Sequence, residues 1–74
     1  MIIYKNTTAP AENAEADVRT AVQTVWRGIA DWLRPGEVAT VAWSVMSTPY
    51  IDMDTENAVT QHTSVMAEVK GVSV

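Results

Sequence analysis

The sequence has 74 residues, a size that fits one small domain and excludes two-domain enzymes, doubly wound nucleotide-binding sheets and barrels. A domain of this length buries only about 60% of the surface that its unfolded chain exposes, so it commonly needs disulfides, a metal or a partner. The sequence contains no cysteine and a single histidine, which excludes disulfides and both thiolate and multi-imidazole metal sites. A protein partner is therefore the expected source of added stability.

The charge pattern narrows the class of partner. The net charge is −4, and the five cationic residues are scattered along the chain, so no basic patch is expected to bind nucleic acid. The longest apolar run, Met1–Tyr4, is too short for a membrane span, and no signal peptide is visible. Charged residues make up only 19% of the chain, which suggests a surface that lies against another protein.

The N-terminal residues divide into two parts by composition. Met1–Tyr4 is apolar and rich in β-formers, which is typical of an arm or a first strand. Residues 5–13 are mostly polar or turn-forming, with Pro10 among them, and favour a linker. We therefore expect an arm and linker over residues 1–13, followed by one small β-rich domain over residues 14–74.

Residues 14–34 carry two conflicting signals. Apolar side chains recur at helical steps of three and four, and Pro35-Gly36 is a suitable stop for a helix. The residues on that helical stripe are Val18, Val22, Val25, Ile29 and Trp32. Against a helix, most residues from 18 to 29 are β-branched, aromatic or otherwise weak helix formers, and the even positions would also make a strand face. The periodicity favours a helix and leaves a strand as the alternative.

The second half of the chain predicts strands joined by short turns. Residues 37–46 alternate between two faces, with Trp43 in mid-strand, where we expect it at the centre of the core. Residues 51–56 alternate apolar and acidic side chains, as in a protected edge strand. Residues 63–70 again alternate between two faces, as in a strand, and Gly71 interrupts this pattern.

No constellation of residues indicates catalysis. The acids from Asp52 to Glu56 suggest a calcium loop, but the sixth and twelfth positions are Asn57 and Thr63 instead of glycine and glutamate. His62 has no nucleophile elbow near it, and the three glycines are too dispersed for a phosphate loop. No nucleophile, base and orienting group can be named together, so we expect no enzyme, no metal, no cofactor and no small-molecule substrate.

Trp26 and Trp32 have two interpretations. A place in the core is the simpler one, and the alternative makes one of them an anchor at a binding interface, where tryptophan is enriched. Combined with the apolar residues near both chain ends, the second interpretation defines an expected partner interface. Its residues are Ile2, Ile3, Tyr4, Trp26, Trp32, Val72 and Val74.

Four motifs from residue 20 onward resemble a family of small bacteriophage proteins, the fibre–tail adaptor proteins. They are Val25-Trp26, then Asp31-Trp32-Leu33-Arg34-Pro35-Gly36-Glu37-Val38, then Ala42-Trp43-Ser44-Val45, and Thr63-Ser64-Val65-Met66-Ala67-Glu68-Val69. The resemblance implies an immunoglobulin-like β-sandwich and a structural role that links tail or neck to fibres. It implies no catalytic residue, and it implies a location in the virion, which is assembled in the cytoplasm of the host bacterium.

The sequence departs from that family at two places. Trp32 follows Trp26 by six positions, which leaves room for a helical turn, and the family continues past the position of Val74 into a final hairpin. A sandwich without its last strands has an open edge, so we expect a strand from a neighbouring subunit to cover it. Met1–Tyr4 is the segment that we expect to be exchanged in this way.

Together these arguments predict a mainly β fold: a small immunoglobulin-like sandwich, incomplete at its end, with a strand over residues 20–26 and a short helical turn over 28–33. The alternative is an α+β fold with one helix over 14–34 packed on a small antiparallel sheet. The predicted function is that of a virion adaptor whose partners are tail, neck or fibre subunits and copies of itself. A capsid decoration protein and a small helical dimeric regulator are the alternatives.

Overall fold

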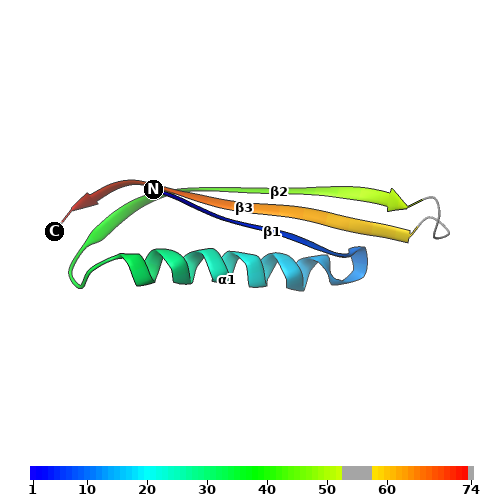
Figure 1. The fold of residues 1–74 in the computed structure, drawn as a ribbon, viewed down its shortest axis with the longest axis horizontal. Coiled ribbons are helices and arrows are strands. Elements are labelled where there is room, and N and C mark those ends of the chain that lie inside the picture. Colours follow the sequence, from blue (N-terminus) through cyan, green and yellow to red (C-terminus); the bar gives the residue numbers. More distant parts are fainter. Residues whose placement is uncertain (53–57, 74) are drawn as a thin grey trace.

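The computed structural model describes residues 1–52 and 58–73 of the chain. Its elements in chain order are β1 (Ile2–Pro10), a short 3-10 helix η1 (Ala11–Asn13), α1 (Ala14–Trp32), β2 (Val38–Asp52) and β3 (Ala58–Ser73). The strands form one antiparallel sheet in the order β1-β3-β2. Helix α1 lies along one face of this sheet, so the fold has two layers (Figure 1).

The fold is mainly β with one helix, and the α+β alternative fits it. The immunoglobulin-like sandwich is not confirmed, because the described residues build a single sheet that packs against a helix. The predicted strand over 20–26 and the separate helical turn over 28–33 are wrong, since residues 20–26 and 28–32 lie within the continuous helix α1 and Leu33 has an extended backbone.

Helix α1 forms in spite of its weak helix formers because one side of it is buried. Ala21, Val25 and Ile29 recur every four residues and are all buried against the sheet. The hydroxyls of Thr20 and Thr24 donate hydrogen bonds of 3.0 and 2.9 Å to the carbonyl oxygens four residues earlier. The two hydroxyls thereby find hydrogen-bond acceptors within the helix. Burial of the apolar stripe outweighs the low helix propensities of these residues.

The end of α1 agrees with the predicted stop at Pro35-Gly36. Leu33 already has an extended backbone, and Arg34 precedes a proline, a position that disfavours helix. Gly36 has φ = 84°, a conformation that glycine adopts without strain. The Arg34 amide donates to Oε1 of Glu37 at 2.6 Å, and the Glu37 amide donates to the Arg34 carbonyl at 3.1 Å.

The N-terminal segment is a full strand of the sheet. β1 pairs with β3 from Ile2 opposite Glu68 to Pro10 opposite Thr60, and Ile3 packs against the core. The expectation of a linker is therefore wrong for residues 5–10, which continue the strand that begins in the predicted arm. Only residues 11–13 form the connection to α1.

Strands β2 and β3 form a long antiparallel hairpin. Their pairing runs from Val38 opposite Ser73 to Asp52 opposite Ala58, with one shift of register between Thr40 and Val41. The strands predicted from alternation over 37–46 and 63–70 are confirmed except for residue 37, and both extend further. Most of the predicted acidic strand over 51–56 lies outside the described residues.

The core consists of small aliphatic side chains. They come from α1 and β3 and are Ala21, Val25, Ile29, Val65, Ala67 and Val69. The prediction that Trp43 is the core centre is wrong: its side chain is 38% exposed, because α1 packs on β1 and β3 and leaves β2 at the side. Trp26 and Trp32 are also exposed, which contradicts the simpler interpretation that placed them in the core.

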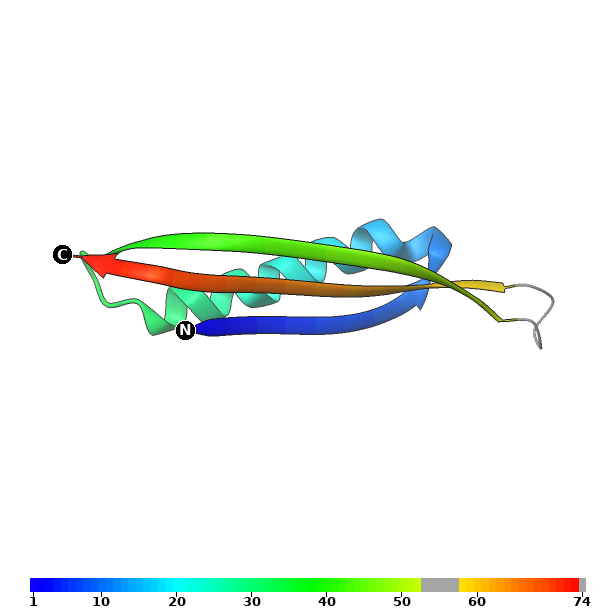
Figure 2. The same cartoon turned by 90° about the horizontal axis from the view of Figure 1, so that it is seen from above.

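The molecule is elongated and thin, as Figure 2 shows from above. Its extents are 54 × 17 × 13 Å, and its radius of gyration is 15.4 Å, compared with about 11 Å for a compact domain of this length. Its accessible surface is 5438 Å², whereas a compact monomer of the same mass exposes about 4,500 Å². The chain therefore leaves about a fifth more surface open than a globular protein of its size.

Candidate interaction surface

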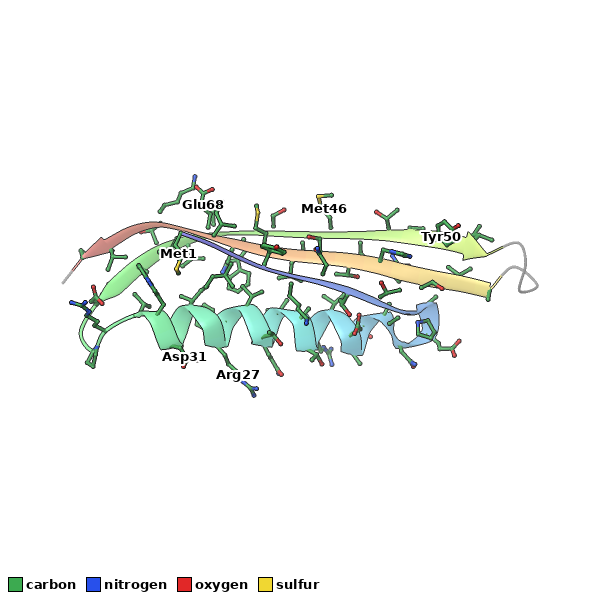
Figure 3. All side chains as sticks on the ribbon, viewed as in Figure 1. Met1, Arg27, Asp31, Met46, Tyr50 and Glu68 are labelled. Atoms are coloured by element: carbon green, nitrogen blue, oxygen red, sulfur yellow. The ribbon has the colours of Figure 1, made fainter. Side chains whose placement is uncertain are left out.

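The register of the sheet assigns each strand residue to one of two faces, since paired residues share a face. The face away from α1 is uncovered by the described residues, and Met46, Tyr50 and Glu68 point outward from it (Figure 3). Polar side chains alternate with apolar ones there, among them Asn6 and His62. Such a mixture is typical of an antiparallel sheet that faces solvent, so this face is not the strongest candidate for an interaction surface.

The other candidate lies on the helix side of β2. Trp43 and Val45 point to this side and are 38% and 50% exposed. Trp26 of α1 is 57% exposed and stacks on Trp43, with ring centroids 5.8 Å apart and an angle of 28° between the rings. We call Trp26, Trp43 and Val45 together the tryptophan strip.

The strip arises from the position of α1 on the sheet. Gly28 lies on the flank of the helix that meets β1, where a Cβ would be 3.4 Å from Cδ1 of Ile3. Helical periodicity places Trp26 on the opposite flank, beside the buried Val25. Trp26 extends from this flank to β2 and stacks on Trp43, so a pair of indoles borders the core on that side, with Trp26 more than half exposed.

The strand beside the strip is an edge strand that carries no charged residue before Asp52. β2 is the outer member of the sheet, and residues 38–51 include no Asp, Glu, Lys or Arg. Charged residues on an edge normally discourage pairing with another chain. Pro49 is the only residue of this stretch that lacks a backbone donor.

The hairpin end of β2 is more polar than its middle. The Ser47 and Thr63 hydroxyls are hydrogen-bonded at 3.0 Å, and Nε2 of Gln61 donates to the Ser47 hydroxyl at 2.8 Å. Further along, the rings of Tyr50 and His62 meet edge to face, 5.7 Å apart. On the helix side, Ser47 and Thr63 interrupt the apolar surface after Val45, and the paired Ile51 and Val59 beyond them are again exposed.

The predicted interface residues near the chain ends do not form one surface. Ile2 and Tyr4 are exposed on the uncovered face of β1, whereas Ile3 points toward α1 and packs on the core. Val72 is 38% exposed near the end of β3, and Val74 lies outside the described residues. The structure therefore separates these residues instead of joining them to the tryptophans.

The tryptophans of the predicted interface also lie apart. Trp26 belongs to the strip, whereas Trp32 is 48% exposed at the last residue of α1. Sequence reasoning missed Val45 and assigned Trp43 to the core. The signal that could have found them is the uncharged run over 38–51, which is unusual for a strand at an edge.

The described residues show neither a pocket nor a cluster of metal-ligating side chains. No pocket is found, and these residues include no group of three histidine or acidic side chains that could hold a metal ion. The acidic segment considered for calcium lies largely outside residues 1–52 and 58–73. In the same part of the chain, no helix has the length and apolar character needed to cross a membrane.

Comparisons of the chain with protein-family models, curated proteins and solved structures found no match. The resemblance to fibre–tail adaptor proteins therefore depends on the sequence motifs alone. The tryptophan strip and the β2 edge together form the candidate interaction surface.

Proposed function

We propose that this chain is a non-enzymatic structural protein that works through protein–protein contacts. The tryptophan strip is the observation that carries the proposal. Two stacked indoles and a valine lie exposed beside an uncharged edge strand, which is a costly surface to leave in water. Tryptophan is enriched among the residues that dominate binding energy, and the cores of interfaces are depleted of charge.

The proposed mechanism combines two kinds of contact. The outer edge of β2 offers backbone amides and carbonyls that can pair with a strand of another chain. The tryptophan strip lies on the helix side of β2 and offers apolar surface that is buried when the strand of the other chain pairs with β2. Backbone pairing sets the register of the contact, and burial of the strip supplies most of its free energy.

We propose a bacteriophage virion as the setting, with the chain as an adaptor that links tail or neck to fibres. The support is the order of motifs around Trp26, Trp32 and Trp43 that resembles the fibre–tail adaptor family. The expected partners are tail, neck or fibre subunits and copies of the chain itself. Because the fold is not the sandwich which that family implies, the motifs support the setting and the β2 surface supports the mode of binding.

The geometry gives less support to a helical dimeric regulator. Such a dimer would use the apolar stripe of α1, but Ala21, Val25 and Ile29 are already buried against the sheet. The side of α1 away from the sheet is polar, and Arg27 and Asp31 point outward from it (Figure 3).

Mass spectrometry of purified phage particles tests this proposal. We expect the chain in a fixed ratio to the tail or neck subunits, and we expect particles made without it to lack fibres. Particles that keep their fibres but lose capsid stability would instead indicate a decoration protein. Absence of the chain from particles, while it is abundant in the infected cell, would contradict a role in the virion.

A further inference from the structure

We infer that two copies of this chain pair through their β2 strands, antiparallel and about a two-fold axis, and form one continuous six-stranded sheet. In this dimer the tryptophan strips of the two copies lie on the same side of the sheet and meet across the axis. The inference rests on the proposed function and names the first partner, a second copy, and the surface that it occupies.

The two edges of the sheet differ in ways that favour β2. β1 is nine residues long, has Lys5 within it, and is covered on its inner side by α1. β2 is 15 residues long, has no charged residue from 38 to 51, and has exposed apolar side chains on its inner side. Lysine and a covering helix both protect an edge from pairing, and β2 has neither.

The charge of the chain favours a second copy over a basic partner. Two chains of net charge −4 repel each other over most of their surfaces, but not along an uncharged strand. A basic partner would instead gain from the acidic residues, which lie elsewhere, for example Glu15 and Asp31 on α1. The surface that best tolerates self-association is therefore the uncharged stretch of β2, which also exposes Trp43 and Val45.

The position of Pro49 sets the register. A proline has no amide to donate, so continuous pairing should end before it. The longest antiparallel self-pairing that ends there covers residues 38–48 and has its midpoint at Trp43. In this register Trp43 faces Trp43 of the second copy, and Val45 faces Val41 of the second copy. Because paired residues share a face, both helices lie on the same side of the joined sheet.

The open surface of the chain is of the size that such a contact needs. The chain exposes about 900 Å² more than a compact monomer of its mass. A stable interface of standard size buries about 800 Å² on each partner. Covering the β2 edge and the strip would bring the surface of each copy close to that of an ordinary globular protein.

The substitution Val45→Lys tests the surface by sedimentation velocity. Val45 is half exposed in the single chain, so the lysine can reach water and the fold should be retained, as circular dichroism can check. In the dimer the ammonium group would face Val41 of the second copy. We expect the dimer dissociation constant to rise by at least about tenfold.

Two matched variants introduce the same charge elsewhere. Tyr4→Lys places it on β1, the other edge, and Met46→Lys places it on the next residue of β2 but on the uncovered face. We expect both to dimerise like the unaltered protein to within about threefold, because neither charge enters the apolar contact. Dissociation by Met46→Lys but not by Val45→Lys would show that the sheets stack by their open faces, and would overturn the inference.

Disulfide trapping tests the register independently. The chain has no cysteine, so Ala42→Cys together with Ser44→Cys introduces the only thiols. These positions lie on the uncovered face, and in the inferred register each opposes the other in the second copy, within reach of a disulfide. We expect a covalent dimer on mild oxidation, and none from the matched pair Asn6→Cys with Thr8→Cys on β1.

The outcomes separate this inference from the function on which it rests. An unaltered protein that self-associates, but is insensitive to Val45→Lys and gives no covalent dimer at 42 and 44, would overturn β2 pairing and leave a structural role intact. A protein that stays monomeric at high concentration would overturn β2 pairing even if the chain is present in particles. Absence from particles with intact β2 dimers would overturn the virion role alone.

Discussion

Val25 and Val65 are the largest side chains that the fold buries completely, one from α1 and one from β3. The interior between them is completed by alanines and by a few other aliphatic residues. Because burial stabilises the fold in proportion to the apolar area removed from water, a core of such small side chains contributes little free energy of unfolding. Each methyl group in it should therefore have a measurable effect on stability.

We expect Val25→Ala to lower the free energy of unfolding by about 2 kcal/mol, since it removes two buried methyl groups and leaves a cavity. Urea denaturation followed by circular dichroism measures this loss. The matched control is Val38→Ala on β2, where the side chain is 66% exposed and the change should stay within about 0.5 kcal/mol. Equal losses at the two positions would contradict the assignment of the core.

Trp43 shows what residue patterns can and cannot predict. Alternation correctly places Val41, Trp43 and Val45 on one face of a strand. Whether that face is covered depends on where α1 lies across the sheet, and nothing in the strand itself encodes this. The same limit applies to Trp26, whose helical position is predictable but whose stacking on Trp43 is a tertiary contact.

At the scale of elements, periodicity and propensity disagreed over residues 14–34, and periodicity gave the right answer. Val25 and Ile29 of the predicted stripe are buried on α1 together with Ala21, Trp32 of that stripe is exposed, and the strand favoured by the family resemblance is wrong. Burial of Val25 and Ile29 explains why, because packing of an apolar stripe outweighs intrinsic preferences.

β1 could be predicted only in part, because its second half has no local pattern that indicates a strand. Residues 5–10 have no apolar alternation, and Pro10 suggested a turn. They form a strand because β3 lies beside them and pairs with them along their whole length. Pairing with a distant segment is not visible in the composition of a short polar stretch.

We expect deletion of residues 1–5 to unfold the chain. The deletion removes the part of β1 that pairs with Val65–Glu68, and it removes Ile3 from the core. Residues 6–10 still pair with β3, but the third strand is halved and the core loses the Ile3 side chain that packs against it. Loss of a cooperative thermal melt, followed by circular dichroism, is the expected result.

A shortened chain that melts cooperatively but no longer self-associates would point to the other possibility, namely that residues 1–5 act as an exchanged arm between subunits. Unchanged melting and unchanged assembly would contradict both roles for this segment.

At the scale of the whole molecule, thinness is the property that links fold to function. The molecule is 54 Å long and 13 Å across at the narrowest, and in its described part the core cluster between sheet and helix contains six buried aliphatic side chains. The expectation of an incompletely covered interior was made from the sequence, and the exposed indoles at β2 are consistent with it. The covering element was expected at the chain ends, whereas the exposed strip lies in the middle of the chain.

The most direct test of this account is the dependence of thermal unfolding on protein concentration. If association through β2 contributes to the stability of the fold, the melting temperature should rise by several degrees over about a hundredfold increase in concentration. The Val45→Lys variant should melt at the low-concentration value throughout. A cooperative melt at one high temperature, independent of concentration and of Val45→Lys, would show a self-sufficient monomer and contradict the account.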